Sequence, residues 1–396
     1  MTKKPLSYLK NLHFLVPKTI DFIIFDHTNA EPLATVIPDN SSRVIFKTRP
    51  VQLNLNPKIL ARFILNLKYF DLTRCFGSKR GFGYRFFWQM LMLYIKADIE
   101  IREPKAIITF IDNCPKFAWL SERLKDIPCI AVQNGFRLSY AANLEYKYYC
   151  QYLFCFGEQQ AEQFPKLGYK VDHYYPVGSL FLSNSIEMSH DKTYPKYDLL
   201  IVSCWRGNIG FQQDVDDSMK SMRFMDVMLS RYLGKRDLKA AVILRTERDS
   251  FDWIMPEVGM SEENYYKSIY GDKVEIIETE FSERNIYTTM QSSDLIVAGF
   301  GTTCLIEAFS IGKKILYANF CGTDKYHVDF CPEIVFSGTD EDYSLFEARL
   351  DKLTTITERD FEKKYKKMMG YYASDPRMVS VQRKVKDQIS RILEQR

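Results

Sequence analysis

Two threonines and a glutamate between residues 293 and 319 are the side chains of this sequence best suited to binding a phosphorylated ligand. The segment reads SDLIVAGFGTTCLIEAFSIGKKILYAN, which predicts a strand, a glycine turn, a helix and a second strand. Thr302 and Thr303 follow Gly301 where the helix must begin, so their hydroxyls can cap it and its free N–H groups can hold a phosphate. Glu307 follows on the same helical face and can accept hydrogen bonds from ribose hydroxyls. The segment therefore predicts a nucleotide site.

A glycine turn before a capped helix also occurs in βαβ units that bind no ligand, so the surrounding elements must decide. The first half of the chain alternates apolar strands with helices. The predicted strands are 21–25, 43–47, 106–110, 129–132 and 152–156, and the predicted helices are 57–69, 82–95 and 117–124. Strands that are apolar throughout and separated by helices predict a parallel sheet covered on both faces.

Polar side chains follow four of these strands. They are Asp26 with His27, Asp112 with Asn113, Gln133 with Asn134, and Glu158. Ligands of doubly wound sheets gather at the carboxyl ends of the strands, so these side chains are candidates for the site. We expect the acceptor to meet His27, Asn113, Gln133, Asn134 and Arg137.

A second strand–helix series follows an irregular segment at 176–197 that is rich in Pro, Ser and Asn. Its predicted strands are 199–203, 240–245, 274–277, 295–298 and 314–318, with helices at 224–233, 262–270 and 285–291. We therefore expect a first Rossmann-like domain at 1–180, a second at 190–375, and a helix at 376–396 that packs back towards the first. The predicted fold class is α/β, with two doubly wound domains facing a cleft.

Three residues at strand ends of the second series could neutralise a donor phosphate. Ser203 and Arg206 follow its first strand, and Arg245 ends the next. Arginine binds phosphate in a bidentate manner. The alternative for Arg245 is an ion pair with Glu247 or Asp249.

Acidic residues are needed if the ligand is a sugar donor, because transfer requires a base or a carboxylate nucleophile. Glu158 and Asp112 are candidates through their strand-end positions. Asp226, which the pattern places near the start of a helix, is a third. Asp214, Asp216 and Asp217 lie in the preceding segment, which we expect to be a loop.

Composition excludes several classes. The 54 Lys and Arg against 50 Asp and Glu give a net charge of +4, too weak a bias to predict nucleic-acid binding. The nine cysteines and five histidines show no metal-ligand spacing, so we expect a metal-independent protein without a cofactor. Scattered cysteines in apolar surroundings indicate buried thiols, and no stretch is long enough to span a bilayer, which together predict a cytoplasmic location.

The aromatic segment 82–95 (FGYRFFWQMLMLYI) has two interpretations. Its periodicity favours a core helix of the first domain. Because Lys79 and Arg80 precede it, it could instead form a basic, aromatic face that rests on the inner surface of the cytoplasmic membrane.

Two longer segments resemble a known family. The run AIITFIDNCPKFAWLSERLKDIPCIAVQNGFR at 106–137, followed by FCFGE and later by the glycine–helix segment, resembles the bacterial surface carbohydrate biosynthesis proteins. Those look like GT-B glycosyltransferases and are similar to the retaining β-Kdo transferases that use CMP-Kdo. The resemblance spans most of both domains. It implies that Glu158 faces the donor and that the nucleophilic aspartate follows Ser203, for which we choose Asp226.

The expectation is thus a glycosyltransferase that moves a sugar, Kdo from CMP-Kdo in the finest form, to a lipopolysaccharide or surface polysaccharide acceptor. The expected partners are a nucleotide sugar and a lipid-linked or oligosaccharide acceptor, with peripheral membrane contact and no nucleic acid. Residues Thr246–Arg248 stand where many relatives of the fold carry His-Pro, so the donor stays open. Two alternatives remain: a CDP-polyol phosphotransferase, which would need a histidine base, and a non-catalytic scaffold.

Overall fold

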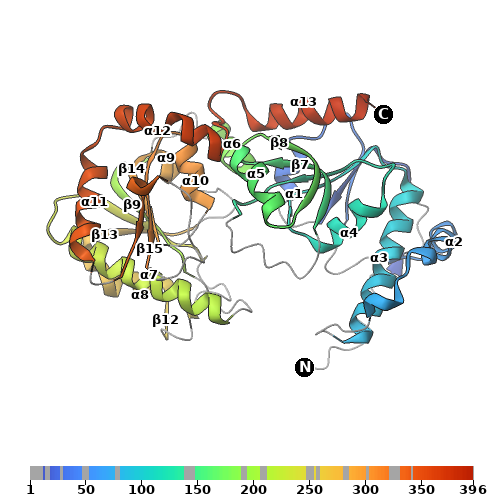
Figure 1. The fold of residues 1–396 in the computed structure, drawn as a ribbon, viewed down its shortest axis with the longest axis horizontal. Helices are drawn as coiled ribbons and strands as arrows, with labels where there is room; N and C mark the ends of the chain where they lie inside the picture. The colour runs from blue at the N-terminus through green and yellow to red at the C-terminus, as the bar shows by residue number, and fades with distance from the viewer. Residues whose placement is uncertain are drawn as a thin grey trace.

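The computed structural model contains two six-stranded sheets whose strands all run parallel. It describes residues 12–13, 18–26, 30–46, 53–75, 81–137, 148–188, 194–205, 212–246, 254–255, 259–279, 285–299, 303–320, 331–339 and 342–395. Side chains are not described at 12–13, 74–75, 212–218 and 254–255. Each sheet is the centre of one Rossmann-like domain (Figure 1), as the alternating strands and helices predict.

The first domain has the strand order β3-β2-β5-β6-β7-β8. Its sheet strands are β2 (Phe22–Phe25), β3 (Arg43–Phe46), β5 (Ala106–Thr109), β6 (Cys129–Val132), β7 (Tyr149–Cys155) and β8 (Lys170–Pro176). Its helices are α1 (Ala30–Ala34), α2 (Pro57–Asn66), α3 (Phe82–Arg102), α4 (Pro115–Arg123) and α5 (Glu158–Lys166), and a small parallel pair joins β1 (Leu12–His13) to β4 (Leu53–Asn54). Short 3₁₀ turns, η3 (Leu67–Tyr69) and η4 (Leu72–Cys75), follow α2.

The second domain has the order β13-β10-β9-β14-β15-β16. Its sheet strands are β9 (Tyr197–Val202), β10 (Ala240–Ile243), β13 (Val274–Ile277), β14 (Ser293–Ala298), β15 (Lys314–Asn319) and β16 (Val335–Ser337), and β11 (Ile254–Met255) pairs with β12 (Met260–Ser261) outside it. Its helices are α7 (Gln212–Leu233), α8 (Glu262–Tyr270), α9 (Asn285–Gln291), α10 (Thr303–Ser310), α11 (Tyr343–Thr355) and α12 (Glu358–Tyr372), with 3₁₀ turns η6 (Gly271–Lys273) and η8 (Pro332–Ile334).

Two helices join the domains. The segment 176–197, predicted to be irregular, contains α6 (Leu180–Met188), whose Leu182 belongs to the second core and whose Leu180 belongs to the first. The last helix, α13 (Val381–Glu394), lies along the first domain although the chain has just left the second (Figure 1). Its apolar face carries Val381, Val385, Ile389 and Ile392, and these four side chains are buried against one face of the first sheet.

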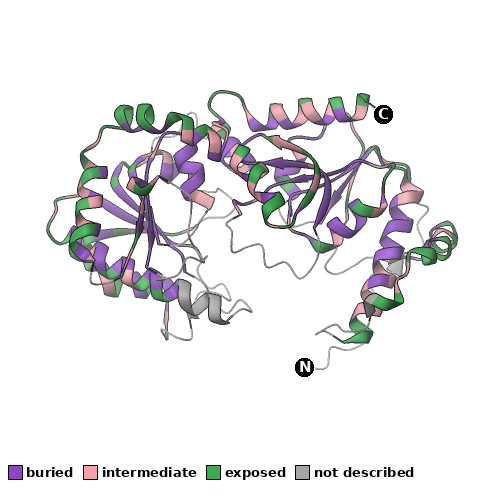
Figure 2. Ribbon diagram, viewed as in Figure 1, coloured by how far each residue is buried: buried purple, intermediate pink, exposed green. Residues whose placement is uncertain are grey.

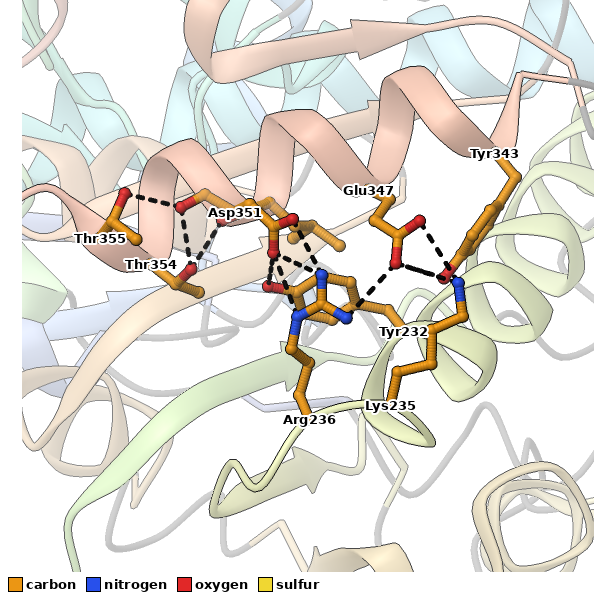
Figure 3. A network of polar contacts seen from close by, with 9 residues as sticks. Tyr232, Lys235, Arg236, Tyr343, Glu347, Asp351, Thr354 and Thr355 are labelled. Atoms are coloured by element: carbon orange, nitrogen blue, oxygen red, sulfur yellow. Dashed lines mark hydrogen bonds and ion pairs between the residues drawn. The ribbon is translucent and has the colours of Figure 1, made fainter.

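The long helix α7 is fixed at its carboxyl end by α11 (Figure 3). The guanidinium of Arg236 donates to both carboxylate oxygens of Asp351 at 2.8 Å, and the Tyr232 hydroxyl donates to the same carboxylate at 2.9 Å. The ammonium of Lys235 lies 3.1 Å from Glu347. The predicted helix covered only 224–233. The observed helix starts at Gln212, so the acids at 214, 216 and 217 belong to its first turns and not to a loop.

The turn before α5 touches the end of α12 so closely that only glycine fits. A Cβ on Gly157 would lie 2.5 Å from the carbonyl oxygens of Tyr371 and Tyr372, which are backbone atoms and cannot rotate away. The next residues of the crossing chain are also held, because the Ser374 amide donates to the Phe156 carbonyl at 3.0 Å. Gly157 therefore allows the chain that leaves the second domain to run against the first.

Gly157→Ala is expected to destabilise the protein by about 1–3 kcal/mol, the usual cost of overpacking a filled contact. Gly370→Ala is a matched control in α12, since no atom lies within 4 Å of the added methyl group. That substitution should raise stability by about 0.5–1 kcal/mol through helix propensity. Thermal melting of both variants checks the pair, and equal effects of one sign would contradict the assigned contact.

Candidate functional site

The strand order of the second sheet locates its ligand edge. The chain builds outward from β9 through β10 to β13 and then returns to the other side of β9 with β14. Ligands of open α/β sheets bind at such a switch point, outside the carboxyl ends of the two central strands. Ser203 follows β9 at this edge, and Gly299 follows β14. The same argument places the switch point of the first sheet between β2 and β5, where Asp26 and Asp112 follow the strands.

The glycine turn after β14 is packed against α7. A Cβ on Gly299 would approach the sulfur of Met225 to 2.9 Å. The Ser221 hydroxyl donates to the Gly299 carbonyl at 3.2 Å and accepts from the Phe320 amide at 2.8 Å. Helix α7 thus fixes the turn that leads to the amino terminus of α10. Two of the predicted phosphate residues, Gly301 and Thr302, lie outside the described residues.

The amino terminus of α10 meets a loop of the first domain. The hydroxyl of Thr303 accepts a hydrogen bond from the Phe136 amide at 3.0 Å, and a Cβ on Gly135 would lie 3.1 Å from that hydroxyl oxygen. The Phe136 ring belongs to the core of the second domain. The loop after β6 therefore reaches across to the helix end predicted to bind phosphate, and Thr303 helps to join the two domains.

A glutamine that the sequence did not indicate holds this loop in place. The Gln160 side chain accepts from the Arg137 amide at 2.8 Å and from the Gln133 amide group at 2.6 Å, and donates to the Arg137 carbonyl at 3.0 Å. Gln133 in turn accepts from the Phe156 amide at 3.0 Å. The described contacts of Gln133 fix the backbone at the carboxyl ends of β6 and β7, and its role towards the acceptor stays a prediction.

Asp112, Asn134 and Arg137 form one cluster, in which Asp112 is buried and the other two side chains are half-buried. The guanidinium of Arg137 donates to both oxygens of Asp112, at 2.9 Å from Nε and 2.5 Å from Nη2, and to the Asn134 side chain at 2.8 Å. Asp112 is 1% exposed, and Arg137 is 17% exposed. Burial alone would lower the pKa of Arg137, but the charge and hydrogen bonds of Asp112 outweigh it and raise that pKa. The cluster thus brings together three of the predicted site residues. Two of them form an ion pair, and Asn134 is hydrogen-bonded to it.

The sequence also did not indicate Glu262, a carboxylate that binds the chain at the carboxyl edge of the second sheet. Glu262, the first residue of α8, is fully buried and accepts from the Ser203 hydroxyl, from the Arg245 amide at 2.9 Å and from the Thr246 amide at 3.0 Å. Ser203 also accepts from the Tyr266 hydroxyl at 3.0 Å. The Ser203 hydroxyl is thus used within the protein.

Arg245, in contrast, is exposed at this edge. Its guanidinium donates to the Trp205 carbonyl at 2.7 Å, which holds the side chain beside the carboxyl end of β9. The predicted partner Arg206 and the acids suggested for an alternative ion pair, Glu247 and Asp249, lie outside the described residues. Among the predicted phosphate-binding residues that the structure describes, Arg245 is the one with a charged side chain. That side chain is exposed beside the switch point of the second sheet.

Asp226 lies in the middle of α7, not near a helix start, and has no exposed surface. Its two carboxylate oxygens accept from the hydroxyls of Tyr265 and Tyr270, both at 2.9 Å. Burial raises the pKa of Asp226 to about 7, although the two tyrosines act to lower it. A nucleophile must touch its substrate, and in this arrangement Asp226 touches tyrosines. Its catalytic role stays a prediction.

Asp226→Asn tests that role through pH. Because the folded-state pKa is raised from 3.8 to about 7, the stability that protonated Asp226 contributes is complete below pH 3.8 and is lost as the pH rises to about 7. The asparagine variant should therefore melt higher than the parent at pH 8, with a smaller advantage at pH 5. A structural role also predicts retained sugar transfer. Loss of all transfer in a folded variant would instead identify Asp226 as the nucleophile.

Glu307 is buried at the domain junction. It accepts hydrogen bonds from the hydroxyl of Ser179, which also caps α6, and from the Tyr287 hydroxyl at 3.1 Å. It therefore connects α10 to α6 and α9. Binding of ribose by Glu307 stays a prediction.

Glu158 is the exposed carboxylate among the acids predicted to act. It is the first residue of α5, directly after the turn that follows β7, where the helix amino terminus stabilises its negative charge. Asn113 is half-buried beside Asp112. His27 lies outside the described residues.

The residues that the sequence reasoning missed are Gln160, Ser179, Glu262 and Tyr287. One signal was available: Ser261 caps α8 by accepting from the Asn264 amide, and an acidic residue is favoured in the first turn of a capped helix. That pattern predicts Glu262 at a helix start. It does not predict which strand ends the carboxylate reaches.

Comparison with known proteins identifies the fold class. No protein family and no curated protein matches the chain. Among solved structures, UDP-GlcNAc 2-epimerase from Neisseria meningitidis bound to UDP-GlcNAc aligns with a TM-score of 0.55 at 13% identity, covering 95% of this chain and 100% of that chain. A putative UDP-N-acetylglucosamine 2-epimerase from Listeria monocytogenes gives 0.51 at 12%, covering 90% and 92%. MurG from Acinetobacter baumannii gives 0.50 at 12%, covering 95% and 100%.

These similarities extend over nearly the whole of each chain, and at such low identity they establish the fold. The protein has the GT-B fold, with two Rossmann-like domains joined so that the loop after β6 meets the amino terminus of α10. The predicted fold class is confirmed.

Proposed function

We propose that the protein is a glycosyltransferase that takes a sugar from a nucleotide donor. The observation that carries this proposal is the meeting of the α10 amino terminus with the loop after β6, at the switch point of the second sheet. A helix amino terminus attracts phosphate, and the exposed Arg245 adds positive charge at the same edge. The neisserial structure that shares the fold holds UDP-GlcNAc, which supports a nucleotide sugar as the class of ligand.

The chemistry proposed for this site is the breaking of the bond between the sugar and the nucleotide phosphate. The N–H groups of α10, with Arg245, would stabilise the charge on the departing phosphate. Glu158, exposed at the carboxyl end of the first sheet, would act as the carboxylate that the reaction needs, either as base towards the acceptor hydroxyl or as nucleophile. No metal ion enters this scheme.

The finer form of the proposal is transfer of Kdo from CMP-Kdo to a lipid-linked or oligosaccharide acceptor of a surface polymer, at the inner face of the membrane. Its support is the resemblance of the segments 106–137 and 293–319 to surface carbohydrate biosynthesis proteins. A CDP-polyol phosphotransferase would need a histidine base, for which the sequence offers His27.

The test is incubation of the purified protein with a panel of nucleotide sugars, with and without EDTA, followed by detection of the released nucleotide and of the glycosylated acceptor. The proposal predicts nucleotide release from one donor, increased by an acceptor and unchanged by EDTA. Formation of an epimerised sugar without transfer would replace the proposal with an epimerase, and release of a polyol phosphate would replace it with a phosphotransferase. If no donor is turned over and no nucleotide binds, the protein would be a non-catalytic scaffold.

A further inference from the structure

Exposed apolar side chains gather on one projection of the first domain. Of the fifteen exposed large hydrophobic residues in the described part of the chain, nine lie between residues 60 and 87. We call these nine the hairpin patch: Leu60, Ile64, Leu65, Leu67, Tyr69, Leu72, Phe82, Tyr84 and Phe87. So dense a group is unusual on a soluble surface and indicates an interaction site.

The hairpin patch lies on α2, on the turns that follow it and on the first half of α3. These two helices run antiparallel, because Arg62 in the middle of α2 pairs with Glu100 near the end of α3, while the ring of Phe70, just beyond α2, packs on Phe86 near the start of α3 at 5.4 Å. The hairpin leaves the body of the first domain (Figure 1), and its surface is largely exposed (Figure 2). Phe87 is 73% exposed, whereas α3 is buried from Met92 to Ile99. The core-helix interpretation of the aromatic segment therefore holds for its second half.

A polar network on the inner side fixes the hairpin, and it meets the patch at Tyr69, whose ring centroid lies 4.8 Å from the Lys96 ammonium. The Lys96 ammonium is buried and donates to Glu100 at 2.6 Å, and the Asn66 amide group donates to the same carboxylate at 2.8 Å. Burial alone would raise the pKa of Glu100, but the hydrogen bonds from Arg62, Lys96 and Asn66 hold it at about 2. The helices are thus held together from within. The patch side chains face outward from a supported surface.

The charge of this region says which partner fits. Residues 57–102, from the start of α2 to the end of α3, contain nine Lys or Arg and three acids, Asp71, Asp98 and Glu100, a net charge of +6, although the whole chain carries only +4. Apolar and aromatic side chains mixed with Lys and Arg match an anionic lipid surface, where the rings enter the headgroup region and the cations meet phosphate. A second copy of the chain would bring the same positive charge, so self-association through this patch is opposed by repulsion.

We propose that the hairpin patch docks the protein on an anionic phospholipid surface. The rings of Tyr84 and Phe87 and the aliphatic side chains of Ile64 and Leu65 enter the interface, and Lys68 and its basic neighbours contact the phosphates. The proposal names the surface that would bring the site to a membrane-bound acceptor. It does not depend on which sugar is transferred, or on any transfer.

The test is co-sedimentation of the full-length protein, without donor, with vesicles of phosphatidylcholine alone or mixed with phosphatidylglycerol. Binding is expected to the mixed vesicles and to weaken at high salt. Ile64→Ser/Leu65→Ser should weaken it roughly tenfold through lost apolar contact. Lys68→Glu should weaken it roughly fivefold or more through lost and reversed charge. Leu345→Ser is the matched control, because Leu345 is 64% exposed on α11 of the second domain, and it should bind as the parent does.

Thermal melting of each variant establishes that it is folded, since exposed substitutions of this kind should leave stability unchanged. No binding to either vesicle would overturn the proposal, as would equal loss of binding in the Leu345 control. A dimer in lipid-free solution that Ile64→Ser/Leu65→Ser dissolves would show that a second copy occupies the patch instead. Vesicle binding is measured without donor, so its failure is distinct from failure of sugar transfer.

Discussion

Asp112→Ala is expected to lower the free energy of unfolding by about 3–5 kcal/mol, the range observed when one partner of a buried ion pair is removed. The physical reason is the charge left behind. Arg137 is largely buried, and its guanidinium would lose both carboxylate oxygens that it now contacts. Chemical denaturation of the variant measures the loss.

The double variant Asp112→Ala/Arg137→Met distinguishes the cost of an unpaired Arg137 charge from the cost of losing the whole ion pair. Removing both charges should restore part of the stability, because no uncompensated charge remains. The single variant should also weaken nucleotide binding, since the loop after β6 that meets Thr303 is held by this pair. A cost below about 1 kcal/mol, the range of exposed pairs, would contradict the buried pair.

Glu158→Gln is expected to reduce sugar transfer by about 10²–10⁴-fold or more, the range for loss of a positioned acid–base group. The amide keeps the size and polarity of the side chain but cannot take a proton or attack the sugar. Because Glu158 is exposed and lies at a helix start, the variant should melt close to the parent and bind nucleotide with unchanged affinity. Initial rates and equilibrium binding, measured together, check both expectations.

Glu162→Gln is the matched control for that experiment. Glu162 is one turn further along α5, is also exposed, and accepts from the Tyr371 hydroxyl at 2.7 Å. Glutamine can keep that hydrogen bond, so the transfer rate should not change. Equal loss of activity in both variants would mean that α5 as a whole, and not the Glu158 carboxylate, affects the reaction.

The sequence predicted the central strands because each contains a nearly continuous run of apolar residues. It missed β8 (Lys170–Pro176), in which no residue is buried and most are exposed, because the strand lies at the edge of its sheet. It also missed α6. The Pro, Ser and Asn of that segment suggested a linker, but Ser179 caps the helix and Leu180 and Leu182 bury its apolar face between the domains. Edge position and domain packing are tertiary facts that local composition does not contain.

The sequence indicated at which edge of the sheet the candidate site residues lie. It did not indicate which side chains they contact. Strand ends placed Asp112, Gln133 and Glu158 at one edge, because parallel strands carry their carboxyl ends to the same side. Whether such a residue is free or engaged depends on partners far away in sequence. Gln160 is 27 residues from Gln133, and Glu262 is 59 residues from Ser203. These partners hold Gln133 and Ser203 in the structure, and the predicted ligand roles of the two residues stay predictions.

The central claim is that a nucleotide binds where α10 meets the loop after β6, and equilibrium binding tests it most directly. CMP, CDP, UDP and GDP are titrated against the parent protein and against Arg245→Ala, with melting temperature and heat as readouts. We expect one of the four nucleotides to stabilise the protein by about 2.7 kcal/mol at a hundredfold excess over Kd, and so to raise its melting temperature. Arg245→Ala should weaken this binding. If no nucleotide changes the melting temperature or releases heat, the assignment of a donor site is wrong.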